Sequence, residues 1–486
     1  MELYADQSKE SSANRFAYET VVKRWPVIIT SIIDNVHQAN HEIMTKGSTD
    51  NFYNKIVEGK QLIRSLSELK AEMSRDRPLR FIPDDRGVDI SVYNDELQAL
   101  INLELNTWFT APWLFAECYL YRLVRSWFAL TVHWSQHDPF EHQKIFTFQA
   151  SGKAVFQLAV TMADLDDASS SMSMDDARLE ILFGEMIQMC LWGNATDLSL
   201  LPSLDYKDIQ ALQSVGKIAQ AASMDHILRN DSQQVWESLK DLRDAQIDVV
   251  LDNSGFELFT DLVLADFLVT HTPFVSKVVF QYVARFVSLT DSRCVPCSPK
   301  LLPWFVSDVL PKDFASQLAE KDWVSFFVSS YPSPSDQEAA ALTGMMRRWR
   351  SHIASGAFEL SVPLDTPIGP LSVDFNRREG DNSALDGATF WTLPYSFWRL
   401  PEQISLINQL EKSALVIFKG DLNYRKLTAD VKWSASTPLP SAIGPLGGHI
   451  PILSLRTCKA DVVVGLEPGV AEKLDEQEKG WRVSGK

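Results

Sequence analysis

Acidic and amide side chains follow two apolar runs in the second half of the chain. Asp252 and Asn253 come directly after residues 247–251, and Asp308 follows residues 304–307. Carboxylate and amide oxygens are hard ligands that suit Mg²⁺ or Mn²⁺. Taken alone, Asp252 and Asn253 favour a helix cap, and Asp308 could also be a cap or turn residue. Two such run ends together make a shared metal site more plausible than either does alone.

A lysine ends a third apolar run, residues 415–418. The segment that follows contains Lys419, Gly420, Asp421, Asn423 and Arg425. A lysine beside a glycine turn and a helix start can hold a phosphate group. A surface loop with ordinary charges is the alternative, and the rarity of this combination after an apolar strand favours the phosphate site. Arg456 and Lys459, after a fourth run, are either a second anion contact or structural charges.

The elements that must position these residues change in type near residue 245. Apolar residues recur at helical spacing over residues 14–45, 51–74, 112–131, 142–166, 176–192 and 232–243. Short β-branched runs then begin, at 247–251, 275–280, 304–307, 415–418, 453–455 and 461–464. They alternate with helical segments, of which an amphipathic one is expected at about 256–270, and this order predicts a mainly parallel sheet covered on both faces.

Such sheets bind ligands outside the carboxyl ends of their strands. The chain is therefore predicted to consist of a helical domain, 1–240, and an α/β domain, 241–486. The Pro-rich residues 331–335 and 438–451 are expected to be surface loops, and 472–479 a solvated helix.

Composition limits the classes of partner. The chain has 486 residues, 46 basic and 63 acidic, for a net charge of −17. A broad basic surface is therefore not expected, which argues against nucleic acid and an anionic membrane as partners. No leader-like segment, spanning helix or disulfide framework is evident. These features predict an intracellular, cytoplasmic protein, with a nuclear location left open.

Six motifs, in order, resemble those of one family, the metal-dependent damage-control phosphatases of the domain-of-unknown-function 89 superfamily. They lie at residues 112–119, 192–199, 252–257, 304–308, 418–427 and 456–459. The last, Arg456-Thr457-x-Lys459, is similar to the mark of the eukaryotic sugar-phosphate phosphatase subfamily, the acidic-residue methyltransferase-like group. The resemblance runs from about residue 14 to the end of the chain.

The resemblance implies an activity and a set of site residues. It implies a three-layer αβα sandwich after a helical N-terminal part, and hydrolysis of small sugar phosphates such as fructose 1-phosphate and fructose 6-phosphate. It implies that Asp252, Asn253 and Asp308 are catalytic and hold a divalent metal, Mn²⁺, Co²⁺ or Ni²⁺, with Mg²⁺ as a further candidate. Either a metal-bound water or an aspartate would attack phosphorus. The substrate-binding candidates are Asp252, Asn253, Glu257, Asp386, Lys419, Asp421, Asn423, Arg425 and Asn194.

Two of these candidates carry open alternatives. Asn194 would reach the site from the helical half or cap a helix, and Asp386 would line a sugar pocket or belong to the core. The spacing between Asp252 and Asp308 also exceeds the family pattern. The excess falls in residues 281–298, interpreted as an insertion that should loop out of the sheet; if it paired into the sheet instead, Asp308 would be displaced.

Two other functions remain to be separated from phosphatase activity. One is AdoMet-dependent methylation of protein carboxylates, which is also proposed within this subfamily. The turn after the first strand holds a single glycine, Gly255, which is a poor AdoMet loop and suits a metal site better. The other is a non-catalytic interaction protein, which would have no need of the set Asp252, Asn253, Asp308 and Lys419. Oligomeric state is not predicted.

Overall fold

The computed structural model describes residues 15–46, 50–87, 89–171, 176–193, 226–281, 307–361, 364, 390–478 and 480–483. Two predicted site residues, Asn194 and Asp386, lie outside these ranges. So do residues 304–306 of the predicted strand before Asp308, and all of the predicted insertion except Gln281.

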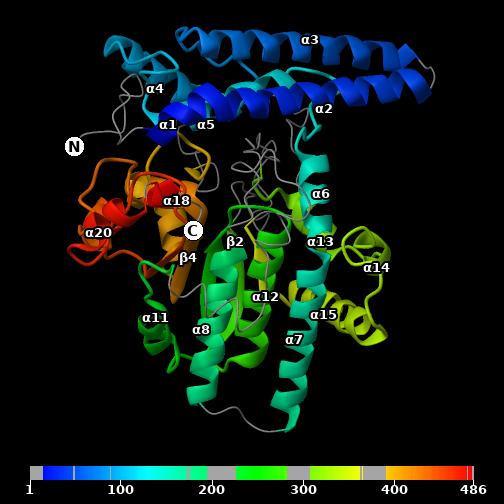
Figure 1. Cartoon of the computed structure of the whole chain (residues 1–486), viewed down its shortest axis with the longest axis vertical. Helices are drawn as coiled ribbons and strands as arrows, with labels where there is room; N and C mark the ends of the chain where they lie inside the picture. Colours follow the sequence, from blue (N-terminus) through cyan, green and yellow to red (C-terminus); the bar gives the residue numbers. More distant parts are fainter. Residues whose placement is uncertain are drawn as a thin grey trace, which may run out of the picture.

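Helices occupy the described chain up to residue 239. They are α1 (Arg15–Glu19), the π-helical η1 (Thr20–Arg24), α2 (Trp25–Lys46), α3 (Asp50–Ser74), α4 (Ile90–Asn102), α5 (Trp113–Ala129), α6 (Glu141–Ala150), α7 (Gly152–Ser171), α8 (Asp176–Gly193) and α11 (Ser232–Leu239). The predicted helical segments are confirmed, and α4 is an additional helix. Figure 1 shows α2 and α3 side by side at one end of the molecule, while α7 and α8 run toward the other end.

A five-stranded sheet follows. Its strands are β1 (Ala245–Val250), β2 (Val275–Gln281), β3 (Phe358–Leu360), β4 (Leu415–Lys419) and β5 (Ile452–Leu455), and every pairing is parallel. The order is β3-β2-β1-β4-β5. The chain thus builds outward from β1 on one side and then returns to build β4 and β5 on the other. The carboxyl ends of β1 and β4 form the switch point where open parallel sheets bind ligands.

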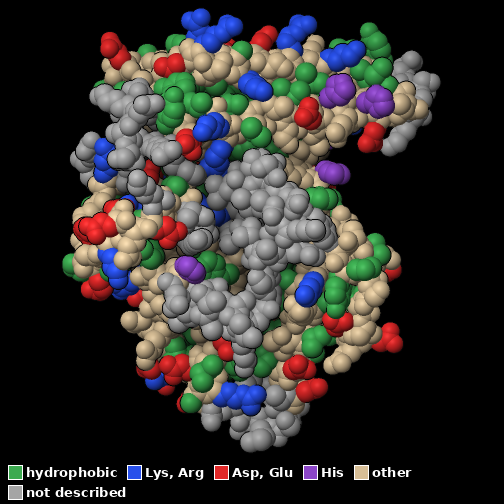
Figure 2. Space-filling view, in the orientation of Figure 1, with side chains coloured by type: hydrophobic (Ala, Val, Ile, Leu, Met, Phe, Trp, Pro, Cys, Tyr) green, Lys and Arg blue, Asp and Glu red, His purple; other side chains and the backbone are tan. Residues whose placement is uncertain are grey.

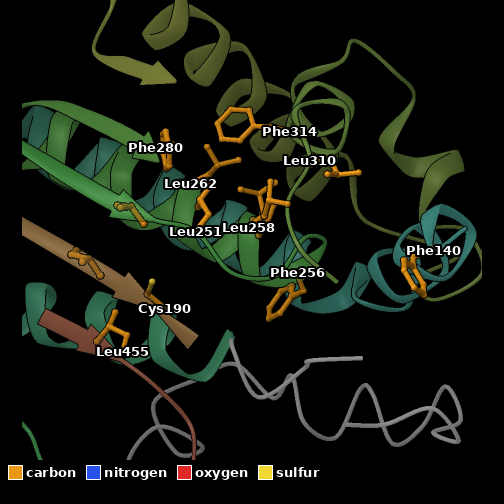
Figure 3. Packing of buried hydrophobic residues seen from close by; sticks show 14 of the residues in the cluster. Phe140, Cys190, Leu251, Phe256, Leu258, Leu262, Phe280, Leu310, Phe314 and Leu455 are labelled. Carbon is orange, nitrogen blue, oxygen red and sulfur yellow. The ribbon is translucent and has the colours of Figure 1, made fainter. Parts of the chain in front are cut away.

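Alternate residues of the strands enter two different cores. Ile247 and Val249 of β1 belong to the core that contains α12 (Phe256–His271), whereas Val250 belongs with Phe390 and Trp391 to a second core. This alternation confirms the three-layer αβα arrangement, because a strand places successive side chains on opposite faces. Figure 3 shows Leu258 and Leu262 packed with Phe280 and Phe314 in the first core.

Helix α12 was expected to be amphipathic, and this was wrong: all residues from Phe256 to Leu268 are buried. The cause is that α7 and α8 pack onto the helix on the side away from the sheet. The polar residues along α12 therefore lie inside the protein, where they need partners.

The expected strand at 461–464 is also wrong, since no strand forms there. The backbone groups of this segment form hydrogen bonds with side chains instead of with a neighbouring strand. The Val464 N–H donates to the Tyr424 hydroxyl, 3.0 Å, and the Val462 carbonyl accepts from Arg456 Nη1, 2.7 Å. The short edge strand β3 was not predicted.

The remaining elements are α13 (Pro311–Leu318), α14 (Trp323–Phe326), α15 (Asp336–Ser355), η4 (Phe397–Glu402), α17 (Ile404–Leu410), α18 (Gly420–Leu427), α19 (Leu439–Ala442), η5 (Gly444–Leu446), α20 (Val470–Gln477) and η6 (Trp481–Val483). The loop at 331–335 and the charged helix near 472–479 are confirmed. Residues 438–451 contain two short helices rather than loop alone.

One core joins the helical half to the sheet half. Phe148 of α6, for example, packs against Phe259 of α12 with ring centroids 6.2 Å apart. The division into domains at about residue 240 stays a prediction. On the described part of the face in Figure 2, basic and acidic side chains are interspersed. Among the described helices, none has both the length and the apolar content needed to span a bilayer.

Candidate functional site

Three predicted site residues meet just beyond the carboxyl end of β1. Asn253 and Asp308 face each other in an isolated antiparallel bridge. The segments around them are joined on both sides: the Val309 N–H donates to the Asp252 carbonyl, 3.1 Å, and the Ser254 N–H donates to the Ser307 carbonyl, 2.6 Å. Asp308 therefore lies beside Asp252 and Asn253, whereas the strand predicted to lead to it, at residues 304–306, lies outside the described residues.

The orientation of the Asn253 amide is set by its neighbours. Its Nδ2 donates to Asp252 Oδ2 and to Glu257 Oε2, both at 2.7 Å, and the Ser307 hydroxyl donates to its Oδ1. Two carboxylates thus hold the NH₂ end, which leaves the Oδ1 end on the side of the Asp308 segment. A buried amide held in this way presents one defined oxygen.

Gly420 lets the chain at the end of β4 pass close to the Asp252 side chain at the end of β1. It follows Lys419 at the end of β4 and has φ +82°, a conformation that favours glycine. A Cβ at this position would lie 1.8 Å from Asp252 Oδ2. The Asp252 carboxylate therefore occupies the space directly over the Gly420 backbone, at the switch point of the sheet.

Lys419 is fully buried and paired inside the protein. Its Nζ donates to Asp261 Oδ1, 2.7 Å, and to the Cys190 carbonyl, 2.9 Å, and it lies 3.2 Å from Glu257 Oε1. Burial lowers the pKa of Lys419, but the negative charge around it, chiefly that of Asp261, outweighs this and the pKa is raised well above its usual value. The lysine is therefore charged and links α8, α12 and β4.

Asp261, which was not among the predicted site residues, is the carboxylate that pairs most closely with Lys419. Burial raises its pKa to about 6, against the lowering effect of Lys419. The signal was present: Asp261 follows Glu257 by four positions, so both carboxylates lie on one face of α12.

The segment after Lys419 is held by internal contacts. Asp421 accepts from Arg456 Nε, 2.7 Å, and from the Lys459 N–H, 3.3 Å, which joins it to the 456–459 motif. Asn423 Nδ2 donates to the Lys419 carbonyl, 2.8 Å, and to the Leu251 carbonyl, 3.2 Å. These contacts fix the ends of β1 and β4 relative to each other.

Two cations of the segment after Lys419, Arg425 and Lys426, also have internal partners. Arg425 pairs with Asp430, 3.0 Å, and with Glu117 of α5, and it stacks on Trp113. Lys426 Nζ donates to the carbonyls of Trp391 and Leu393, and burial lowers its pKa. The charge of Arg425 is thus balanced by carboxylates, whereas Lys426 is held by neutral carbonyls. Substrate contacts of Asp421, Asn423 and Arg425 stay predictions.

The donor set at the switch point fits a hard divalent cation. Asp252 and Asp308 supply carboxylates and Asn253 an amide oxygen, and glycine at 420 leaves the Asp252 carboxylate its space. Within the described ranges, no cluster of three or more His, Cys, Asp or Glu is placed to hold a metal. The candidate set differs from such a cluster in using an amide as its third ligand.

Fold and site together define a protein with a parallel αβα sheet and a buried oxygen-donor site at its switch point. The sequence profile of the damage-control phosphatase ARMT1-like domain matches residues 20–474. The chain is 32% identical over 494 aligned residues to damage-control phosphatase ARMT1 of Xenopus tropicalis, covering 97% of this chain and 94% of that protein. The human protein of the same name is 30% identical over 487 aligned residues, with 97% and 94% covered. The chain therefore belongs to the damage-control phosphatase ARMT1-like family.

A crystal structure of a DUF89-family protein from Pyrococcus horikoshii aligns over 92% of this chain and 94% of its own, at 12% identity and a TM-score of 0.33. That likeness is too weak to place residues.

Proposed function

We propose that this protein is a divalent-metal-dependent phosphatase that hydrolyses small sugar phosphates such as fructose 1-phosphate and fructose 6-phosphate. The observation that carries the proposal is the meeting of Asp252, Asn253 and Asp308 at the switch point between β1 and β4. The family membership supports the phosphatase class. The choice of sugar phosphates rests on the resemblance of the 456–459 motif.

In this proposal Asp252, Asn253 Oδ1 and Asp308 would hold the metal, with Mn²⁺, Co²⁺, Ni²⁺ and Mg²⁺ as candidates. When bound, the cation supplies Lewis-acid stabilisation of phosphate charge. The chain's own residues set the geometry: Glu257 orients the Asn253 amide, and Lys419 forms ion pairs with Glu257 and Asp261. Lys419 is the candidate phosphate contact, and its ammonium would then exchange a present partner for a phosphate oxygen.

The proposed substrate is a small phosphorylated metabolite, in keeping with a site that is mostly buried. Asn253 is 5% exposed and Asp308 8% exposed, so a large polyanion would not reach these donors. The proposal places the protein in the cytoplasm, where sugar phosphates occur.

The experiment is phosphate release from a panel of sugar phosphates with each metal, with and without EDTA. We expect release from fructose 1-phosphate that requires metal and is lost in the Asp252→Ala and Asp308→Ala variants. Activity that survives either substitution would sink the proposal. A parallel reaction with labelled AdoMet tests protein-carboxylate methylation, and labelled protein in place of phosphate release would favour that chemistry.

A further inference from the structure

A buried lysine of the helical half reaches the segment that carries Asp308. Lys144, on α6, is 4% exposed, and its Nζ donates to the Asp308 main-chain carbonyl, 2.8 Å. The same ammonium binds Asp313 Oδ2 at 2.8 Å and Asp138 Oδ2 at 3.3 Å. The Lys144 ammonium therefore connects α6 both with Asp308, which precedes α13, and with Asp313 in the first turn of α13.

The contact acts on the backbone of a candidate metal ligand. On its other side, the 307–309 segment is bonded to 252–254 by the two main-chain hydrogen bonds described above. Asp313 in turn accepts from the Leu310 N–H, 2.9 Å, so the residues after Asp308 are held as well. Lys144 is thus the side-chain support that approaches the Asp308 main chain from the helical half.

Burial makes this support costly to lose. A buried ammonium is stable only when its donors are satisfied and its charge is paired, and here oxygens of three residues do both. Without Lys144, Asp138 would keep Lys312, 3.3 Å away, whereas the Asp313 carboxylate would lose its cation beside the Asp308 segment. The segment would then shift to hydrate or separate these charges.

We propose that Lys144 is a positioning residue that holds Asp308 in place for the divalent metal, so that the helical half sets metal affinity. This inference rests on the proposed function, because it assumes that Asp308 is a metal ligand. Residues that orient metal ligands from behind typically change affinity or activity by about 10- to 100-fold when they are removed.

The test is a direct Mn²⁺ titration of the full chain, followed by the EPR signal of free Mn²⁺, with Lys144→Met, Lys144→Arg and Lys153→Met. Lys153 lies on neighbouring α7 and is exposed, so it controls for the loss of one positive charge. We expect the dissociation constant to rise about tenfold or more in Lys144→Met, to rise less in Lys144→Arg and to stay at the parent value in Lys153→Met. Should Lys144→Met not fold, Asp313→Asn is titrated instead and is expected to weaken binding in the same direction.

The outcomes separate the two proposals. A parent protein that binds no Mn²⁺ overturns the proposed function. A parent that binds Mn²⁺ while folded Lys144→Met binds it equally well overturns the role of Lys144 alone, even if the variant melts at a lower temperature. Equal weakening in Lys144→Met and Lys153→Met would reduce the effect to net charge and also overturn it.

Discussion

Replacing Gly420 by alanine tests whether the contact between the ends of β1 and β4 builds the site. The new Cβ would lie 1.8 Å from Asp252 Oδ2 and 2.9 Å from Asp252 Cβ, so the aspartate must move as a whole. Movement breaks its bond with the Asn253 amide, 2.7 Å. Gly356 offers a matched control: its φ is +80°, close to the +82° of Gly420, and a Cβ there would meet no atom within 4 Å.

Both substitutions therefore strain the backbone, but only Gly420→Ala also breaks a hydrogen bond. Both place a side chain in the left-handed region, which costs about 1–2 kcal/mol. Gly420→Ala additionally loses a hydrogen bond to a charged group, worth about 1.5–3 kcal/mol. We expect a destabilisation of about 1–2 kcal/mol for Gly356→Ala and of about 2.5–5 kcal/mol for Gly420→Ala.

Urea denaturation without metal measures the stability difference, and Mn²⁺ titration measures the site. Because the displaced carboxylate is a proposed ligand, Gly420→Ala should also weaken Mn²⁺ binding by about tenfold or more, whereas Gly356→Ala should not. The reasoning is refuted if the two variants lose equal stability and Gly420→Ala binds Mn²⁺ like the parent.

Three further predictions concern charge. Asn253→Asp places a like charge where an amide donor now joins two carboxylates, so metal-free stability should fall and added Mn²⁺ should recover part of it in a thermal melt; an unchanged melt contradicts this. Burial raises the pKa of Asp461 to about 7, so the protonated carboxyl that the folded protein prefers is present at low pH and is lost as pH rises through this pKa. The free energy of unfolding of Asp461→Asn should therefore increase relative to that of the parent between about pH 5 and about pH 8. A difference that stays constant over this range would refute the prediction. Arg348→Met leaves the buried Asp266 without its arginine and should lower the free energy of unfolding by about 3 kcal/mol in urea, with no effect expected if that pair were solvated.

The sequence predicted the parallel sheet and the meeting of Asp252, Asn253 and Asp308. Strand ends of a parallel sheet share one edge, so a residue's position after an apolar run places it in space without knowledge of contacts. Asp308 lies beside Asn253 as expected, although Ser307 and Asn253 are 54 positions apart, but the strand expected to lead to Asp308 falls on residues 304–306, outside the described part of the chain. The same β-branched pattern failed at 461–464, because strand preference reflects a half-buried surface and not the backbone itself.

The partners of Lys419 could not be predicted. One is the main-chain carbonyl of Cys190, 229 positions away, and carbonyls carry no sequence signature. The burial of Asp261 was hidden for a related reason: α12 is covered on the side away from the sheet by α7 and α8, which only the tertiary packing reveals. The hydrogen bond from Lys144 to the Asp308 carbonyl could not be predicted for the same reason, because its acceptor is also a main-chain carbonyl of a distant residue.

The central claim is that Asp252, Asn253 and Asp308 hold the metal. A crystal structure of the protein grown with Mn²⁺, with an anomalous map at the manganese edge, tests it most directly. The account predicts one manganese peak bonded to both carboxylates and to Asn253 Oδ1, and no peak there in Asp308→Ala crystals. A peak elsewhere, in crystals of an enzyme whose phosphatase activity requires Mn²⁺, would contradict it.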